Sequence, residues 1–335
     1  MSEILFIKTT NSSFVRKDEE FLKRNYATKV FHFKYGAFLR VFLSEIQLTL
    51  WVFRHIWHSK LLFIWFADYH SLIPILVAGV LGRKSVLVVG GYDVANMPEL
   101  RYGVFVRKFR GLCAGCSLRN ASFVLPVAES LIQDIYENVG DVKGTIEVIQ
   151  TGYDYEKWKP NEPKTANQVL TVAIVDSHQR CRIKGIDLFI EIAKRMPDME
   201  FVLVGVNDNG RDLIEKISID NLVVVGRIQQ DELLRYYQTA RIYAQLSLRE
   251  GLPNVLCEAM LCECVPVGSD IASIADVIGD TGIILKSREV DEGVNAIQEA
   301  LKSDGGKLAR HRIMRMFPQR KRDEALKELM DSLLV

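Results

Sequence analysis

Two glutamates frame the segment Glu-Gly-Leu-Pro-Asn-Val-Leu-Cys-Glu at residues 250–258, and seven residues separate Glu250 from Glu258. The turn between them, Gly251-Leu252-Pro253-Asn254, is expected to open a helix, because Asn254 is a preferred N-cap residue. Apolar residues at helical spacing support that helix: Val255, Leu256, Ala259 and Met260. We therefore expect Glu250 in the loop before the helix and Glu258 about one turn inside it.

This layout predicts a ligand that carries both phosphate and sugar. The free amides and the positive dipole of a helix N-terminus suit a phosphate group. Carboxylates beside such a site are poor phosphate ligands, but they accept hydrogen bonds from sugar hydroxyls. The pattern thus predicts a nucleotide-sugar site. The alternative is an ordinary capped helix with two solvated glutamates.

The motif resembles the donor-site signature of the retaining GT-B glycosyltransferases of family 4, the glycosyl transferases group 1. The resemblance rests on the two glutamates with Gly-Leu-Pro-Asn between them, on Glu258-Ala259-Met260 and on Val265-Pro266-Val267. It covers nearly the whole chain, most firmly residues 169–285. It implies a retaining hexosyltransferase that uses a UDP- or GDP-sugar without a metal or other cofactor. Glu250 would then bind hydroxyls of the donor sugar, and Glu258 the ribose.

A diphosphate also needs cations. Lys184 lies between an expected strand and an expected helix, where an ammonium can bind the diphosphate and stabilise charge as the bond breaks. The resembled family has an Arg and a Lys in this loop. Lys184 matches the Lys, whereas Arg180 and Arg182 both remain candidates for the Arg. Solvated charge at a helix entry is the alternative for all three.

Two further turns of the second half are donor-site candidates. Gly205 closes the strand at residues 201–204, and Gly226-Arg227-Ile228 follows the strand at 222–225. In similar enzymes the second turn cradles the base through the backbone around Arg227 and Ile228. Gly205 is either a direct contact or simply the end of a strand.

The first half departs from the family pattern after the strand at residues 86–89. Many members read His-Gly-x-Asp there, and the His contacts the transferred sugar. Here the residues are Gly90, Gly91, Tyr92 and Asp93, so Gly90 stands where the His would be while Asp93 remains a catalytic candidate. His70 is a candidate substitute, although a lone His after a strand is more often structural.

The loop after the first expected strand is a candidate acceptor site. It lacks the double glycine often seen in the family, but its polar side chains suit a hydroxyl-rich acceptor: Asn11, Ser12 and Ser13. Asp18, a little further on, is expected to be a charge on a helix surface.

Composition indicates a globular protein with two domains. The chain has 335 residues, of which 48% are hydrophobic and 25% charged. Residues 1–150 hold 18 Lys and Arg against 13 Asp and Glu, whereas residues 151–335 hold 25 against 29. Any anionic partner is therefore expected on the first half. Six cysteines in a chain of this length do not suggest a disulfide framework and fit a reducing cytoplasm.

Apolar runs alternate with helical patterns along the chain, which predicts an α/β fold with doubly wound parallel sheets. Five strands are expected in the first half and six in the second: 4–7, 61–66, 86–89, 123–126, 146–149, 169–175, 201–204, 222–225, 242–246, 265–267 and 282–285. We expect an acceptor-side Rossmann-like domain at 1–160 and a donor-binding domain at 161–316. The resemblance implies a GT-B cleft between them and a helix at 317–335 that crosses back to the first domain.

An aromatic and basic stretch at residues 29–60 contains one acidic residue, Glu45, and residues 100–128 add more cations. Basic amphipathic surfaces dock on anionic lipid headgroups. This favours a peripheral protein on the inner face of the plasma membrane that glycosylates a polysaccharide or lipid-linked glycan. The alternative is that the aromatic residues are core and the cations solvated. Near-neutral charge argues against nucleic acid as a partner.

Two other functions fit the same architecture. A sugar-nucleotide epimerase would need acid and base residues in the cleft, and the Glu-Gly-Leu-Pro-Asn loop argues against it. A nucleotide-sugar-binding protein with little catalysis is kept open by Gly90. No Gly-x-Gly-x-x-Gly follows the first strand, which argues against a dinucleotide oxidoreductase.

Overall fold

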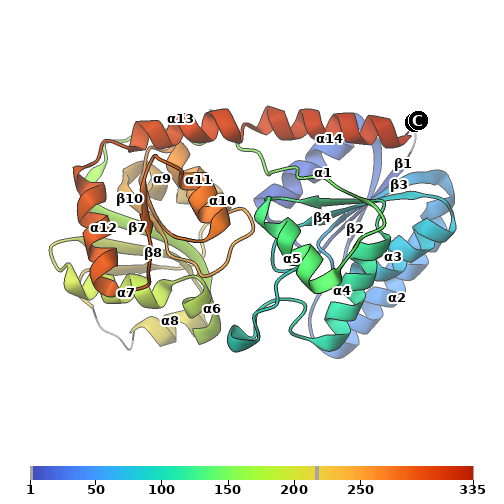
Figure 1. The fold of residues 1–335 in the computed structure, drawn as a ribbon, viewed down its shortest axis with the longest axis horizontal. Coiled ribbons are helices and arrows are strands. Elements are labelled where there is room, and N and C mark those ends of the chain that lie inside the picture. Colours follow the sequence, from blue (N-terminus) through green and yellow to red (C-terminus); the bar gives the residue numbers. More distant parts are fainter. Residues whose placement is uncertain (1–2, 216–218, 335) are drawn as a thin grey trace. The chain divides into compact units, whose positions relative to one another are not determined.

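The computed structural model describes residues 3–215 and 219–334 and divides the chain into two compact units. Unit 1 comprises Met1–Gly152 together with Arg320–Val335, and unit 2 comprises Tyr153–Gln319. Each unit holds one six-stranded parallel sheet with helices packed against it (Figure 1). No helix in the described ranges combines the length and the apolar character that crossing a bilayer requires.

The sheet of unit 1 has the strand order β2-β1-β3-β4-β5-β6. Its strands are β1 (Glu3–Lys8), β2 (Ala27–His32), β3 (Ser59–Trp65), β4 (Lys84–Val89), β5 (Phe123–Pro126) and β6 (Thr145–Ile146). Its helices are α1 (Ser13–Asn25), α2 (Phe38–His55), α3 (Tyr69–Val80), α4 (Lys108–Asn120) and α5 (Ser130–Val139), with short 3₁₀ turns at Ile56–His58 and Pro98–Leu100.

Sequence reasoning missed β2. This strand lies at the edge of the sheet and is only partly buried, and its apolar run is cut to Val30 and Phe31 by Thr28, Lys29 and His32. Fully buried strands such as β3 and β4 read instead as continuous apolar runs, which is why they were predicted.

The sheet of unit 2 has the order β12-β11-β10-β7-β8-β9. Its strands are β7 (Thr165–Val175), β8 (Glu200–Val206), β9 (Leu222–Val225), β10 (Ala240–Gln245), β11 (Val265–Ser269) and β12 (Ile283–Leu285). Its helices are α6 (His178–Ile183), α7 (Ile186–Arg195), α8 (Asp208–Glu215), α9 (Gln230–Thr239), α10 (Asn254–Leu261), α11 (Ala272–Ile278), α12 (Val290–Lys302) and α13 (Gly306–Met316). All six expected strands of this half are present.

The last helix, α14 (Gln319–Leu334), belongs to unit 1 from Arg320 onward. The buried Arg322 guanidinium donates to both carboxylate oxygens of Asp18 on α1, at 2.8 and 2.6 Å. Trp65 Nε1 also donates to Asp18, at 2.9 Å. Asp18 is only 1% exposed, so the expectation of a surface charge was wrong. Its partner lies 304 residues away, and local sequence patterns do not reveal it.

Candidate functional site

Unit 2 has its topological switch point between β7 and β10. The chain runs from β7 outward through β8 to the edge strand β9, and then returns to the other side of β7 as β10. The loops that leave the carboxyl ends of β7 and β10 therefore diverge from neighbouring strands, and ligands of open α/β sheets bind at such a point. Lys184 follows β7 and α6, and Glu250 follows β10, so this edge carries both predicted residues.

Backbone contacts hold these two loops together. Leu248 N donates to Ile183 O at 2.8 Å. Gly185 has a φ of +70°, and a Cβ at this position would lie 1.9 Å from Leu246 O. A side chain at residue 185 would thus separate the loops, which explains why a glycine follows Lys184.

Lys184 and Glu250 form an ion pair, with Nζ 2.7 Å from Oε1. Two more donors reach the same oxygen: Ser247 Oγ at 2.8 Å and Gln245 Nε2 at 3.1 Å. The side chains of Lys184 and Glu250 are 28% and 13% exposed, so both are held yet retain surface. The arrangement places a fixed cation and a fixed carboxylate side by side at the ligand edge of the sheet.

Gln245 and Ser247 were missed by sequence reasoning. Both lie at the carboxyl end of β10, where polar residues interrupt a buried strand. That interruption was the available signal. Ser273 Oγ also donates to the backbone oxygen of Glu250, at 3.2 Å, and so fixes the loop from the α11 side.

The predicted helix after Glu250 is α10, but Asn254 does not cap it. The helix starts at Asn254 itself, with Pro253 in the cap position and no side-chain cap bond. The Asn254 carboxamide instead accepts from Tyr153 Oη at 2.8 Å. The N-cap expectation was therefore wrong, because a tertiary contact competes for the Asn side chain. Gly251, Leu252 and Pro253 are buried, whereas Val255 is half-buried.

Glu258 lies one turn inside α10 and is 4% exposed. Tyr237 Oη donates to its Oε2 at 3.4 Å. Burial, and secondly the Glu258 charge, raise the pKa of Tyr237, so this phenol remains a donor toward the carboxylate. The structure thus places Glu258 within α10, and Glu250 in the loop that precedes this helix.

The remaining donor-site candidates are spread along the same edge. Arg180 and Arg182 are exposed on α6, and Arg180 Nε lies 3.4 Å from Asp176. Gly205, within β8, has a φ of +108°, and a Cβ there would lie 2.4 Å from Ala173 O. Its need for glycine is therefore explained by strand packing. Arg227 is exposed and Ile228 half-buried after the edge strand β9, two strands from β7.

In unit 1 the switch point lies between β1 and β3. The β1 loop carries Asn11, Ser12 and Ser13. Asn11 Oδ1 accepts from Lys8 Nζ at 2.8 Å, and Ser12 occupies the cap position of α1 without a side-chain cap bond. Among the described residues, the buried Oγ of Ser12 has no hydrogen-bond partner.

Gly90 has a neighbour that explains the missing side chain. A Cβ at Gly90 would lie 2.4 Å from Cε1 of Phe66, so the Phe66 ring occupies the space that a histidine would enter. Phe66 adopts a φ of +73°, a backbone conformation uncommon for residues other than glycine. Its ring lies against Phe14 and Trp65, with centroid distances of 6.3 and 5.3 Å.

Asp93 organises the loop after β4 from within. Its carboxylate accepts from the backbone amides of Gly90, Gly91 and Ala67, at 3.0, 2.8 and 3.1 Å. Burial raises the pKa of Asp93 to about 6, against the effect of these amides. With 1% of its surface exposed, Asp93 lies beneath the loop. Tyr92, between these residues, is 39% exposed.

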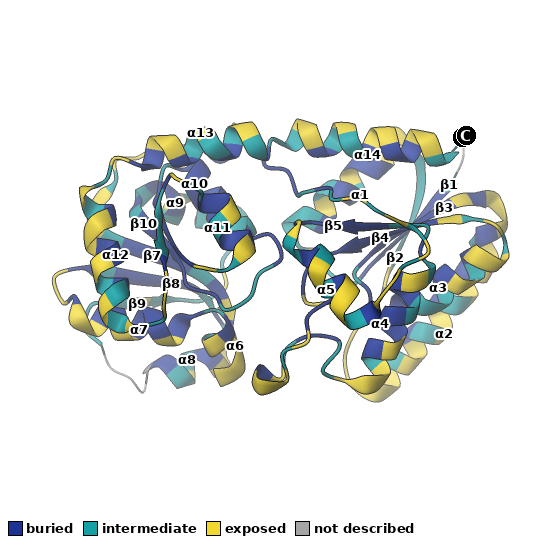
Figure 2. Ribbon diagram, in the orientation of Figure 1, coloured by how far each residue is buried: buried dark blue, intermediate teal, exposed yellow. Residues whose placement is uncertain are grey.

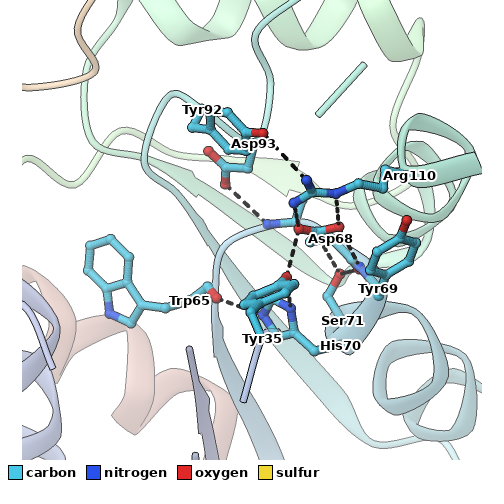
Figure 3. A network of polar contacts seen from close by, with 10 residues as sticks. Tyr35, Trp65, Asp68, Tyr69, His70, Ser71, Tyr92, Asp93 and Arg110 are labelled. Carbon is cyan, nitrogen blue, oxygen red and sulfur yellow. Dashed lines mark hydrogen bonds and ion pairs between the residues drawn. The ribbon is translucent and has the colours of Figure 1, made fainter. Parts of the chain in front are cut away.

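His70 is completely buried. Its Nε2 lies 2.9 Å from Trp65 O, and its Nδ1 lies 3.2 Å from Tyr35 Oη (Figure 3). Burial lowers the pKa of His70, which favours a neutral ring. In this structure the ring connects β3 to α3 and presents no surface to a ligand.

A network around Arg110 was not predicted. Its Nε donates to Asp68 Oδ1 at 3.0 Å, a second guanidinium nitrogen pairs with Oδ2, and Tyr35 Oη donates to Oδ2 at 2.6 Å. The guanidinium carbon lies 5.5 to 5.9 Å from the ring centres of Tyr35, Tyr69 and Tyr92 (Figure 3). Burial opposes ionisation of Asp68, but the bonds and charge of Arg110 hold its pKa below the ordinary value.

Two parallel six-stranded sheets with a donor-type motif at the switch point of the second define a GT-B class of α/β protein. Sucrose-phosphate synthase from Thermosynechococcus elongatus has this fold, with a TM-score of 0.80 and 16% identity over 99% of both chains. HepE from Anabaena, solved with UDP and glucose, matches with a TM-score of 0.72 and 16% identity, over 99% of this chain and 100% of that one.

Residues 167–303, within unit 2, match the model of the family described as Glycosyl transferases group 1, the family that the motif resembles. Among curated relatives, a phosphatidylinositol N-acetylglucosaminyltransferase component from Arabidopsis thaliana is 22% identical over 46% of this chain. D-inositol 3-phosphate glycosyltransferase from Corynebacterium urealyticum is 23% identical over 77%. The matches span 36% and 62% of the lengths of these two relatives.

Proposed function

We propose that this protein is a glycosyltransferase that moves a hexose from a nucleoside-diphosphate sugar to a polysaccharide or lipid-linked glycan. The observation that carries the proposal is the Lys184–Glu250 pair at the switch point of a glycosyl transferases group 1 domain. The likeness to the HepE structure with UDP and glucose supports a UDP-sugar as the donor. The similarity to a relative named for transfer to phosphatidylinositol supports a lipid-linked acceptor.

In the proposed reaction the bond between the sugar C1 and the diphosphate breaks. The oxygen of an acceptor hydroxyl forms the new bond to C1 with retention of configuration, and the proton of that hydroxyl passes to the departing diphosphate. Charge develops on the leaving diphosphate. Lys184, with Arg180 or Arg182, would stabilise that charge, so the chain's own cations fill the role of a metal ion. Glu250 would orient the sugar through its hydroxyls, and Glu258 would position the ribose side.

On the acceptor side, we propose contacts from the exposed or half-buried groups of unit 1, Asn11, Ser12, Ser13 and Tyr92. All six cysteines are free thiols, which supports a cytoplasmic location. With a lipid-linked acceptor the enzyme would work as a peripheral protein at the inner face of the plasma membrane.

A nucleotide-sugar-binding protein with little catalysis is the second candidate. The observation that favours it is the Phe66 ring in the space of a residue-90 side chain. Release of nucleoside diphosphate from the preferred sugar nucleotide, followed over time, separates the two. Turnover supports the transferase, whereas binding without turnover supports the second candidate.

Thermal-shift and titration measurements test the donor site. The panel is UDP, GDP, ADP and their common sugars, applied to the wild type, Glu258→Ala and the exposed control Glu299→Ala. We expect a selective stabilisation by one base that Glu258→Ala weakens and Glu299→Ala leaves unchanged. No shift with any nucleotide, for protein shown to be folded, would contradict the proposal.

A further inference from the structure

Helix α2 of unit 1 is apolar on two sides. One side packs inward through Ser44, Leu48 and Val52. On the outward side, apolar residues recur at the helical spacing of three and four positions and are 43–65% exposed: Leu39, Phe42, Leu43, Ile46, Leu50 and Phe53. An amphipathic helix that covers a sheet normally turns charged residues outward, so this exposed stripe is unusual.

The stripe continues onto neighbouring elements of unit 1. At its C-terminal end, the 3₁₀ turn adds Trp57, which is 59% exposed. Helix α3 packs against α2, and α4 packs against α3, as Figure 1 also shows. These two helices add exposed apolar side chains of their own: Leu76, Val80, Phe109 and Leu112. The outward side of α2 is coloured as exposed in Figure 2.

Cations border this apolar surface. Arg40, Gln47 and Arg54 repeat every seven residues and form an exposed row along one edge of the α2 stripe. Lys34 precedes α2, and Arg107 and Lys108 begin α4. Within the described residues, none of these five cations makes an ion pair, so their charge is available to a partner.

Acidic residues are nearly absent from the same part of unit 1. Residues 27–119 contain 12 Lys and Arg but four Asp and Glu. Asp68 and Asp93 are buried and Glu45 is half-buried, which leaves Glu99 as the exposed one. A protein partner that matched this surface would need an apolar patch bordered by acidic residues with few basic ones. An anionic bilayer supplies both the negative charge and the apolar interior across the whole area.

We propose that the surface formed by α2, Trp57 and the exposed residues of α3 and α4 docks on a bilayer that contains anionic phospholipid. The apolar stripe enters the headgroup and acyl boundary, while Arg40, Arg54, Arg107 and Lys108 contact lipid phosphates. The proposal rests on the proposed function only in its link to a lipid-linked acceptor, because docking itself requires no sugar transfer.

Vesicle binding tests the proposal, with Trp57 as the reporter. Wild-type protein is titrated with phosphatidylcholine vesicles, with and without phosphatidylglycerol, and followed by co-sedimentation and tryptophan emission. We expect binding to the anionic vesicles, weakened by salt, with a blue shift that Trp57→Phe abolishes. No binding to anionic vesicles, or binding without a shift from Trp57, would overturn the proposal.

Surface variants separate the two contributions. Phe42→Ser combined with Leu50→Ser is expected to weaken binding about 100-fold or more, since two inserted side chains are lost. Arg40→Gln combined with Arg54→Gln is expected to weaken it about 30-fold, as for two cations at an anionic surface. The control Leu308→Ser, at a 60% exposed apolar residue of unit 2, should bind as wild type. Equal binding by all variants would overturn the proposal.

Two further measurements distinguish the alternatives. Sedimentation velocity of wild type and Phe42→Ser/Leu50→Ser asks whether a second copy covers the surface, and a dimer that the variant dissolves would overturn lipid docking. Nucleotide titration and circular dichroism of the same variants should match wild type. If nucleotide binding is absent while vesicle binding follows these expectations, the proposed function fails and the docking surface stands.

Discussion

The two units place charged side chains at equivalent edges of similar sheets but hold them differently. In unit 2, Lys184 and Glu250 are paired yet keep 28% and 13% of their side chains exposed. In unit 1, Asp68 and Asp93 are 4% and 1% exposed, and Arg110 and backbone amides satisfy them internally. Charge at a strand end is therefore not in itself a sign of a ligand site. Both edges pair their charges internally, and what distinguishes them is how much of the paired side chains stays exposed to a ligand.

The first prediction is that Asp68→Ala damages stability rather than donor binding. It leaves the half-buried Arg110 without its carboxylate and removes the cap of α3, so we expect a loss of about 3 kcal/mol in the free energy of unfolding. Urea denaturation measures it, with the exposed Asp141→Ala as control. If Asp68→Ala lost no more unfolding free energy than Asp141→Ala, the charges of unit 1 would not be structural and the difference between the two units would not hold.

Lys184→Ala is expected to have the opposite profile. Loss of a cation that faces the leaving diphosphate should lower kcat/KM for donor turnover about 100-fold, with little change in unfolding. The control is Lys194→Ala, an exposed lysine on α7 that pairs with Glu191. Nucleoside-diphosphate release is the assay. If donor turnover is unchanged while the free energy of unfolding falls, the Lys184–Glu250 pair is structural, like the Asp68–Arg110 pair of unit 1.

A double-mutant cycle tests whether the Phe66 ring excludes a side chain at residue 90. Gly90→Ala alone should cost about 1–3 kcal/mol in unfolding free energy, because the new Cβ meets the Phe66 ring. In a Phe66→Gly background, where the ring is gone and the positive φ suits glycine, the same change should cost close to nothing. Additive effects of the two substitutions would mean that the ring does not exclude a side chain at residue 90.

The last prediction, an effect confined to part of the pH range, concerns Glu45 on the inward side of α2. Burial, and secondly the charge of Asp68, raise its pKa to about 7 from the ordinary 4.5. Between these pH values the folded protein binds the proton that the unfolded chain releases, so stability falls as pH rises. Glu45→Gln should match wild type below pH 4.5 and exceed it by about 2 kcal/mol at pH 8.

Guanidinium denaturation at both pH values checks this prediction. An equal difference between Glu45→Gln and wild type at the two pH values would show that Glu45 does not titrate with a raised pKa.

Much of the fold was predictable from the sequence, because buried parallel strands are continuous apolar runs. The exception, β2, is a partly buried edge strand in which polar residues leave only a two-residue apolar run, Val30 and Phe31. The Glu250–Glu258 loop was predictable because the motif is local. The hydrogen bonds from Gln245 and Ser247 to Glu250 were not predictable from the motif, because they depend on how the end of β10 approaches Glu250 in three dimensions.

Unit 1 was less predictable for the same reason. Asp18 and Arg322 pair across the length of the chain, and the Phe66 ring at Gly90 joins two strand ends. No spacing rule within one segment contains either contact. The exposed face of α2 was visible only as an aromatic and basic stretch, since periodicity does not tell which apolar stripe of a helix faces inward.

Isothermal titration of the preferred nucleoside diphosphate tests the central claim most directly, with wild type, Lys184→Ala and Asp68→Ala compared at equal folded fraction. We predict that Lys184→Ala weakens binding at least about tenfold, consistent with one lost charge-assisted contact, and that Asp68→Ala binds as wild type. The reverse pattern, unchanged binding by Lys184→Ala and weakened binding by Asp68→Ala, would contradict a donor site at the switch point of unit 2.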